Sequence, residues 1–184
     1  MTSRIEKRII VIIGGPGTGK TTLLEGLIAK GYCCYPEISR EITKEAKAQG
    51  TSSLFIEKPL LFSELLLEGR IKQFQAAQSE KQDLVFIDRG IPDILAYLNY
   101  LEKPYPISFD TACKEHRYTT LFILPPWPEI YTQDTERYED FEQAKAIQNY
   151  IIKTYTHLGY SLIEVPKNNP EKRIQFILDS LSQS

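Results

Sequence analysis

The chain has 184 residues, which is enough for one domain with a sizeable core. Its composition, 42% hydrophobic and 25% charged, is that of a globular protein, and a formal net charge of -2 argues against nucleic-acid or anionic-membrane partners. No apolar run is long enough to span a bilayer, and no signal-type segment follows the N-terminal charges. Three cysteines without framework spacing favour a reducing compartment, so we expect a cytoplasmic protein.

Strand-like and helix-like segments alternate along the chain. In order, the pattern predicts a strand at Ile9–Ile13, a helix at Thr21–Lys30, a strand at Tyr32–Tyr35, a helix from Ser39 to about Gln49 and a long helix after Pro59. It continues with a strand at Leu84–Ile87, a helix from Pro92, a turn region at Lys103–Ser108, a strand at Thr119–Leu124, a helix from about Glu139 to Leu158, a strand at Ser161–Val165 and a helix from Pro170. This order predicts one α/β domain over residues 1–184, a three-layer sandwich with helices on both faces of a five-stranded parallel sheet. Ligands of such sheets bind at the carboxyl ends of the strands.

The segment "GGPGTGKTT" joins the first strand to the first helix and matches G-x-x-x-x-G-K-[ST]. Its residues are Gly14, Gly15, Pro16, Gly17, Thr18, Gly19, Lys20, Thr21 and Thr22. Glycines let backbone N–H groups turn inward around a phosphate, and the helix adds the positive end of its dipole. Lys20 is expected to reach the β- and γ-phosphates, and the Thr21 hydroxyl to bind Mg²⁺. A chance glycine-rich turn is the alternative, but the strand–loop–helix context favours ATP and Mg²⁺ as cofactors.

The segment "VFIDRGIPD" places an acid at the end of a buried strand, with an arginine directly after it. Asp88 is expected to orient Mg²⁺; the alternative is a helix cap near Ile91. Arg89 can orient a second substrate or stabilise the charge on a transferred group, and the alternative is a salt bridge to Glu37 or Glu41. Neither D-x-x-G at this position nor Asn-Lys-x-Asp anywhere is present, which favours ATP over GTP.

Four segments together carry a family resemblance: "IGGPGTGKTTL", "YPEISREI", "FIDRGIPDILAYL" and "LPPWPEIYTQDTERYEDFEQA". They resemble the P-loop AAA-like ATPase/kinase family that includes the ribosylnicotinamide kinase domain of bacterial NAD-regulating proteins. The acid–arginine strand end is also similar to that of thymidylate kinases and deoxynucleoside kinases. The resemblance implies a nucleoside- or nucleotide-kinase-like fold with a lid over about residues 125–140.

The resemblance also implies two catalytic roles. Glu37, at the end of the second predicted strand, would accept the proton of an attacking hydroxyl. Its alternative role is to stabilise a helix N-terminus. Arg137 is the one arginine of the lid segment and would contact the phosphates; its alternative is a helix pair with Asp134 or Asp140.

Other candidates surround the expected site. Pro166 and Lys167 would line the adenine ring, as the corresponding loop does in related kinases. Trp127 and Tyr131 could stack on a base or nicotinamide-like ring, or pack against the base of the lid. Arg40 could hold an acceptor anion or lie on the surface.

For three further charged residues, a role in the site is not the favoured interpretation. Arg117 precedes the fourth predicted strand and is placed at the opposite edge of the sheet. Glu64 and Arg70 could face an acceptor, but a solvated helix face is the favoured interpretation for both.

Two function hypotheses follow. The first is a Mg²⁺- and ATP-dependent kinase of a small acceptor, such as a nucleoside, a nucleotide or a related metabolite. The second is an ATP- or GTP-binding regulatory protein whose nucleotide state controls a protein partner.

Overall fold

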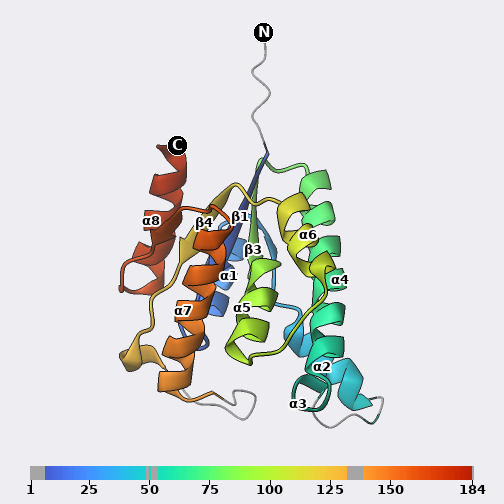
Figure 1. Ribbon diagram of the computed structural model, residues 1–184. Coiled ribbons are helices and arrows are strands. Elements are labelled where there is room, and N and C mark those ends of the chain that lie inside the picture. Colours follow the sequence, from blue (N-terminus) through green and yellow to red (C-terminus); the bar gives the residue numbers. More distant parts are fainter. Residues whose placement is uncertain (1–6, 49, 51–53, 132–138, 184) are drawn as a thin grey trace.

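The predicted strands form one parallel sheet, shown in Figure 1 by a computed structural model that describes residues 7–48, 50, 54–131 and 139–183. The sheet has five strands in the order β2-β3-β1-β4-β5. Their bounds are β1 (Arg8–Ile13), β2 (Cys33–Tyr35), β3 (Leu84–Asp88), β4 (Thr120–Ile123) and β5 (Leu162–Glu164). This arrangement confirms the predicted α/β class and its five-stranded parallel sheet.

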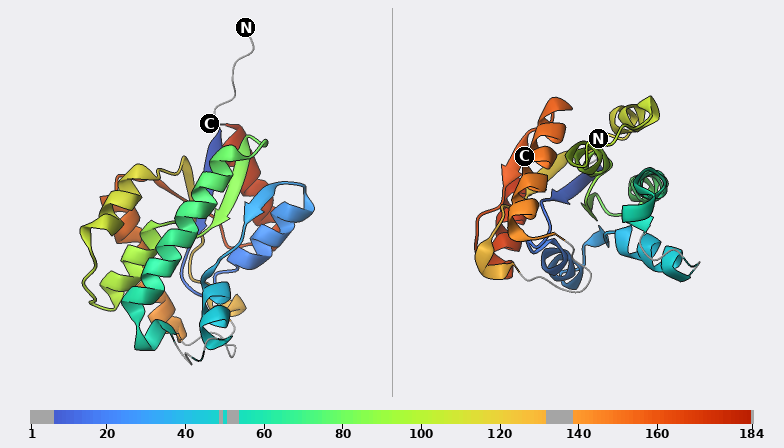
Figure 2. Two further views of the ribbon diagram at one scale, coloured as in Figure 1. Left: turned by 90° about the vertical axis from the view of Figure 1, so that its right-hand side faces the viewer. Right: turned by 60° about the horizontal axis from the view of Figure 1, so that its bottom comes forward.

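The helices lie on both sides of this sheet (Figures 1 and 2). They are α1 (Lys20–Ala29), α2 (Ser39–Ala48), α3 (Leu54–Glu57), α4 (Pro59–Ser79), α5 (Pro92–Tyr100), α6 (Ile107–Glu115), α7 (Phe141–His157) and α8 (Pro170–Ser182). None of the helices in the described part of the chain is long and apolar enough to cross a membrane.

The central strand β1 shows how the layers are held together. Ile9, Val11 and Ile13 pack into a cluster with residues of α4, α5 and α7, whereas Ile10 and Ile12 pack into a second cluster with α1 and α8. Side chains alternate between the two faces of a strand, so β1 contributes to both apolar layers. Each fully buried aliphatic side chain stabilises the fold by roughly 1.5–3 kcal/mol. The strand is therefore a fixed base for the loop that follows it.

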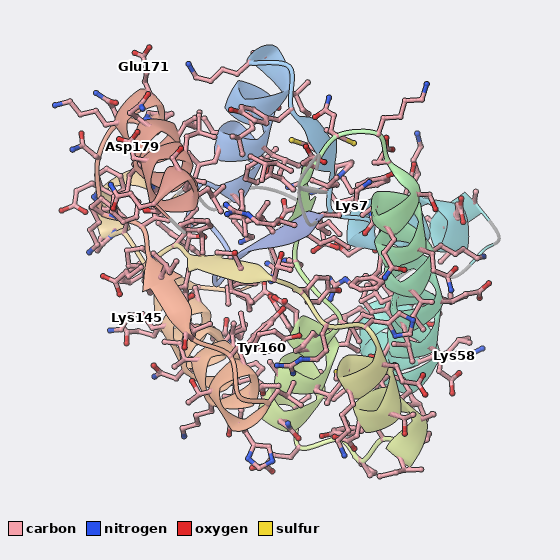
Figure 3. All side chains as sticks on the ribbon, turned by 90° about the horizontal axis from the view of Figure 1, so that it is seen from above. Lys7, Lys58, Lys145, Tyr160, Glu171 and Asp179 are labelled. Carbon is pink, nitrogen blue, oxygen red and sulfur yellow. The ribbon has the colours of Figure 1, made fainter. Side chains whose placement is uncertain are left out.

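Charged side chains mark the outer surface of these layers. Seen from above, Glu171 and Lys58 point outward from the starts of α8 and α4 (Figure 3). Both helices nevertheless bury an arginine on their inner face, Arg173 on α8 and Arg70 on α4. Those two buried charges lie at the carboxyl ends of the strands, where the loops of the candidate site meet.

Two short helices were not predicted. α6 begins inside the expected turn region, after Pro106, which has the extended conformation (φ -64°, ψ 151°) usual for an N-cap residue. Its buried residues, Phe109, Ala112 and Cys113, recur at helical spacing, but its first residue, Ile107, is 77% exposed. The segment is too short for periodicity to stand out, and α3, with 4 residues, gives still less signal.

Candidate active site

The phosphate loop closes on itself around Lys20. The Lys20 ammonium donates hydrogen bonds to the carbonyl oxygens of Gly14 and Gly15, each at 2.9 Å. Gly17 and Gly19 take positive φ angles of 74° and 88°, which glycine adopts without strain. A Cβ atom at Gly14 would lie 2.8 Å from the Leu124 carbonyl oxygen, so the turn also requires glycine for space. The loop thus has the backbone shape that a phosphate cradle needs.

Lys20 and Asp88 lie beside each other because of the sheet register. Asp88 pairs with Ile12 across β3 and β1, one residue before the end of β1. Burial, followed by the charge of Arg89, lowers the pKa of Lys20 to about 7. Burial raises the pKa of Asp88 to about 6, although the charge of Lys20 opposes this. Both groups are therefore held in a site where burial disfavours their charged forms.

Asp88 and Thr21 fit the role of cation ligands. Asp88 is 3% exposed, and its Oδ1 atom accepts no hydrogen bond from any described residue. The alternative role of Asp88, a cap of the helix near Ile91, is not seen: the helix start has no side-chain cap among the described residues, and the Ile91 N–H donates to the Tyr118 hydroxyl at 3.0 Å. Thr21 lies exposed in the first turn of α1. One carboxylate, one hydroxyl and the oxygens of a bound phosphate are a common ligand set for Mg²⁺.

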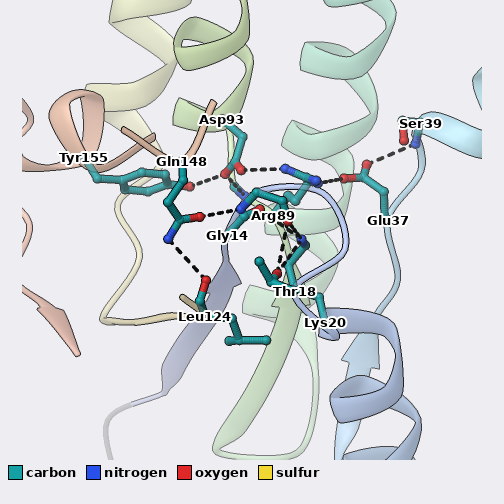
Figure 4. Close-up of polar contacts among 12 residues, drawn as sticks. Gly14, Thr18, Lys20, Glu37, Ser39, Arg89, Asp93, Leu124, Gln148 and Tyr155 are labelled. Atoms are coloured by element: carbon teal, nitrogen blue, oxygen red, sulfur yellow. Dashed lines mark hydrogen bonds and ion pairs between the residues drawn. The ribbon is translucent and has the colours of Figure 1, made fainter. Parts of the chain in front are cut away.

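Glu37 lies at the centre of an ion network after β2 (Figure 4). Its Oε2 atom is 2.7 Å from Arg89 Nε and 3.1 Å from Arg70 Nη2. Its Oε1 atom accepts from the Ser39 N–H at 3.0 Å, so Glu37 caps the start of α2. Burial alone would raise the pKa of Glu37, but the charges of Arg70 and Arg89 outweigh it and hold the pKa below the usual range. The carboxylate is therefore ionised and oriented.

Arg89 adopts a backbone conformation that is rare for a residue with a side chain. Its φ angle is 67°, in the left-handed region. Its Nη1 atom lies 3.2 Å from Asp93 Oδ1, and Asp93 Oδ2 accepts from the Gly90 N–H at 2.9 Å and from the Tyr155 hydroxyl at 2.6 Å. These contacts hold the strained turn in place, as is common for side chains at functional sites. The salt bridge to Glu37, which was the alternative interpretation of Arg89, is present, whereas the contacts with Asp93 and Tyr155 were not predicted.

Arg70 corrects an expectation from the sequence. It was placed on a solvated helix face, yet it is 4% exposed and donates to the Gly90 carbonyl oxygen at 2.8 Å in addition to Glu37. Its spacing from Leu66 and Phe74, four residues to each side, puts it on the buried stripe of α4. That spacing was the signal that could have identified it. Glu64, by contrast, is exposed as expected.

Gln148 on α7 holds the first turn of the phosphate loop. The Gly15 N–H donates to its Oε1 atom at 2.5 Å, and its Nε2 atom donates to the Leu124 carbonyl oxygen at 3.2 Å. A Cβ atom at Gly15 would lie 2.7 Å from the Ala144 carbonyl oxygen, so α7 packs directly on the loop. This role could not be predicted from the sequence, because nothing in the pattern of α7 marks a single amide among apolar helix positions as a partner of the loop.

The structure also places four further residues that the sequence singled out. Arg40 is exposed on α2. Pro166 and Lys167 are exposed on the loop after β5. Arg117 lies at the amino end of β4, as expected, with its guanidinium carbon 3.7 Å from the centroid of the Tyr160 ring.

The segment after β4 contains one 3₁₀ turn, Pro128–Ile130, despite its three prolines. Tyr131 packs against Phe141, with ring centroids 5.4 Å apart, and its hydroxyl donates to the Glu139 carbonyl oxygen. The Trp127 ring lies 5.8 Å from the guanidinium carbon of Arg173. Arg137 and the rest of residues 132–138 of the expected lid lie outside the described residues, so the role of Arg137 stays a prediction.

A parallel sheet whose first strand leads through G-x-x-x-x-G-K-[ST] into a helix defines the class of P-loop nucleotide-binding proteins. Within that class, the family model described as an AAA domain matches residues 9–173. The chain therefore belongs to this AAA-domain family, which confirms the family resemblance seen in the sequence. Among curated proteins, no sequence matches the chain.

Solved kinase structures are similar to the chain in fold. A deoxyadenosine kinase from M. mycoides, with the products dCMP and a flexible dCDP bound, has 15% identity and a TM-score of 0.70, covering 96% of this chain and 100% of that one. A NadR protein in complex with NR has 18% identity and a TM-score of 0.74; the match covers 96% of this chain but 51% of that one. A thymidylate kinase from Ehrlichia chaffeensis has 18% identity and a TM-score of 0.61, with coverages of 96% and 99%. At these identities the likeness shows the fold alone.

Proposed function

We propose that the chain is an ATP- and Mg²⁺-dependent phosphotransferase that acts on a small acceptor: a nucleoside, a nucleotide or a related metabolite. The observation that carries this proposal is the ion network of Glu37, Arg70 and Arg89 beside Lys20 and Asp88. Nucleotide hydrolysis needs a positioned water, whereas a second substrate needs a base and cations of its own. The kinase folds of the similar structures support the same class of reaction.

Each residue of the network then has a defined task. The phosphate loop and Lys20 bind the β- and γ-phosphates, and Thr21 and Asp88 hold Mg²⁺, which neutralises phosphate charge when bound. Glu37 takes the proton of the acceptor hydroxyl as the hydroxyl oxygen bonds to the γ-phosphorus. The bond from that phosphorus to the β–γ bridging oxygen breaks, and ADP leaves. Arg89 stabilises the negative charge on the group in transfer.

The hydrogen bonds of Glu37 define how the acceptor must arrive. Its two oxygens already receive contacts from Ser39, Arg70 and Arg89, which fill the roughly four acceptor positions of a carboxylate. An acceptor hydroxyl must therefore displace one of them. We infer that it displaces Arg89, because this frees the guanidinium for the phosphoryl group while Arg70 and Ser39 keep the carboxylate in place.

The remaining predicted residues keep their proposed places around this reaction. We propose one kinase-like domain over residues 1–184, with a lid at about 125–140 that carries Arg137 and excludes water. Trp127, Tyr131 and Arg40 are assigned to substrate contacts, and Pro166 and Lys167 to the adenine ring.

The test is ADP release from MgATP, measured with and without a panel of nucleosides, nucleotides and pyridine ribosides. The Lys20→Ala protein is the blank. We expect one acceptor to raise the rate and to yield a product heavier by one phosphoryl group. Slow release that no acceptor changes would contradict the kinase proposal and favour the regulatory hypothesis, in which nucleotide state controls a protein partner.

A further inference from the structure

Arg173 is a buried cation beside the phosphate loop that the proposed reaction does not yet use. It lies in the first turn of α8 and is 3% exposed. Its Nη1 atom donates to the Thr18 carbonyl oxygen at 3.1 Å. Its Nε and Nη2 atoms are buried and have no hydrogen-bond partner among the described residues. A buried donor that is left unpaired is costly, and a buried charge is more so.

The two unpaired atoms form one functional edge. The Nε–H and Nη2–H groups of an arginine point the same way, and this pair binds two adjacent acceptors at once. The described part of the protein therefore supplies no hydrogen-bond acceptor for these two N–H groups. Burial lowers the pKa of Arg173, yet a guanidinium remains charged in proteins. The edge is a cationic site for two acceptor atoms.

The surroundings place the Arg173 guanidinium between the phosphate loop and the turn that follows β4. A Cβ atom at Gly19 would lie 3.1 Å from Arg173 Nη1 and 3.4 Å from Ile130 Cδ1. The Trp127 ring lies 5.8 Å from the guanidinium carbon. In Figure 1 the turn at Pro128–Ile130 lies below the N-terminal end of α8. Glu37 and Arg89 follow β2 and β3, on the other side of β1, so Arg173 stands apart from the acceptor network.

We propose that Arg173 binds the nucleotide donor through this N–H pair, contacting two adjacent acceptor atoms of the nucleotide. Two oxygens of one phosphate present such a pair, and so do N7 and O6 of guanine. Because both N–H groups are buried, the turn that carries Trp127 and Ile130 must shift when the nucleotide arrives. The inference rests on the proposed function only in requiring that the phosphate loop binds a nucleoside triphosphate.

The chain offers its own reporter for the test. Trp127 is the single tryptophan, so its fluorescence reports nucleotide binding next to Arg173. The variants are Arg173→Met, which keeps the length of the side chain without donors, and Arg173→Lys, which keeps the charge without the paired edge. Lys172→Met is the matched control, because Lys172 is the exposed neighbour on α8. The ligands are MgATP, MgGTP, adenosine and guanosine.

We expect both Arg173 variants to bind MgATP about 10- to 100-fold more weakly than the wild type, the range for hydrogen bonds to charged groups. Lys172→Met should stay within about twofold. The nucleotide-induced rise in Tm, which does not depend on Trp127, should shrink in the Arg173 variants alone. The free Arg173→Met protein should keep the Tm of the wild type, because it loses an unpaired buried charge along with one hydrogen bond.

Comparison of the four ligands shows whether the hydrogen-bond acceptors for Arg173 belong to a phosphate or to the base. Equal losses for MgATP and MgGTP, with no loss for the nucleosides, assign the edge to a phosphate. A loss confined to the guanine ligands assigns it to the base. If both Arg173 variants bind every ligand as the wild type does, Arg173 is a structural residue and the proposal is wrong, whatever the Tm values. If the wild type itself binds no nucleotide, the proposed function and this site fail together.

Discussion

Arg89 and Glu37 face each other at the carboxyl ends of β3 and β2, with Arg89 Nε 2.7 Å from Glu37 Oε2. The contact joins the residue proposed to stabilise the transferred phosphoryl group to the residue proposed to activate the acceptor. Both side chains are largely buried, with 12% and 17% of their surfaces exposed. In the proposed reaction the two side chains separate in each turnover, because the acceptor hydroxyl takes the place of Arg89 beside Glu37.

Replacing Glu37 tests the base directly. Glu37→Gln should lower kcat with the true acceptor by about 10²- to 10⁴-fold, because the hydroxyl loses its proton acceptor. Glu41→Gln, an exposed change on α2, the helix that follows Glu37, should have little effect. Steady-state kinetics of both variants decide the matter, and full activity in Glu37→Gln would exclude Glu37 as the base.

The pH dependence gives a second test of Glu37. Its pKa lies below the ordinary value of 4.5, so the carboxylate should stay ionised as the pH falls from about 8 to about 5. The measurement is the ¹³C chemical shift of the Glu37 carboxyl group, assigned by its loss in Glu37→Gln, because the charge of Glu37 also acts on Lys20 and Asp88 and a comparison of rates would mix these titrations. A Glu37 signal that titrates between about pH 8 and about pH 5 would show that the carboxylate binds a proton there.

Arg70 should stabilise the folded state as well as hold the Glu37 carboxylate in position. Arg70→Met leaves Glu37 with one cation fewer and the Gly90 carbonyl oxygen without its donor. Loss of one partner of a buried ion pair typically costs about 3–5 kcal/mol in the free energy of unfolding. The control is Lys72→Met, because Lys72 pairs with Glu68 on the exposed side of α4. Urea unfolding of the two variants should separate them clearly; equal midpoints would contradict the role of Arg70.

Replacing Gln148 should weaken binding of the nucleotide more than binding of the acceptor. Gln148→Leu removes the partners of the Gly15 N–H and the Leu124 carbonyl oxygen, so the phosphate loop loses its hydrogen bond to α7. We expect KM for MgATP to rise about tenfold, which corresponds to about 1.4 kcal/mol, with a smaller change in kcat. Asn149→Leu changes the exposed neighbour and should leave both constants close to wild type. A fall in kcat with unchanged KM would indicate another role.

Asp88 should couple the cation to nucleotide binding. In the wild type, Mg²⁺ added with ADP should raise Tm above the value with ADP alone. Asp88→Asn should fold and should lose this Mg²⁺ increment, because the buried Oδ1 atom no longer belongs to a carboxylate. Asp83→Asn changes an exposed acid just before the amino end of the same strand and should retain the increment. An undiminished increment in Asp88→Asn would rule out Asp88 as a cation ligand.

The sequence predicted those parts of the fold that depend on local pattern. The β-branched run before Gly14 and the spacing of Gly19 and Lys20 identify the phosphate loop without tertiary information. Asp88 was singled out from the same kind of local pattern, because it ends a predicted strand and ligands of parallel sheets bind at the carboxyl ends of the strands. Helix α6 was missed because its apolar pattern is too short to distinguish from a turn region.

The polar partners of the site depend on tertiary packing and were harder to predict. Gln148, Asp93 and Tyr155 are meaningful only because α7 packs on the phosphate loop and on Gly90. Two buried arginines did leave a trace: Arg70 and Arg173 each share the stripe of apolar residues on their helix. An arginine at an apolar helical position is thus a signal for a buried site.

The order of the strands has a consequence for how such a protein can change its substrate. β1 separates Glu37 and Arg89, proposed to act on the acceptor, from Arg173, proposed to bind the nucleotide. Under the proposed roles, mutations in α2, α3 and α4 would alter the choice of acceptor and leave the ATP half untouched. Acceptor preference could then change, in evolution or by design, through exchange of the one segment that contains α2, α3 and α4. The reason is that the nucleotide and the acceptor would bind on opposite sides of β1.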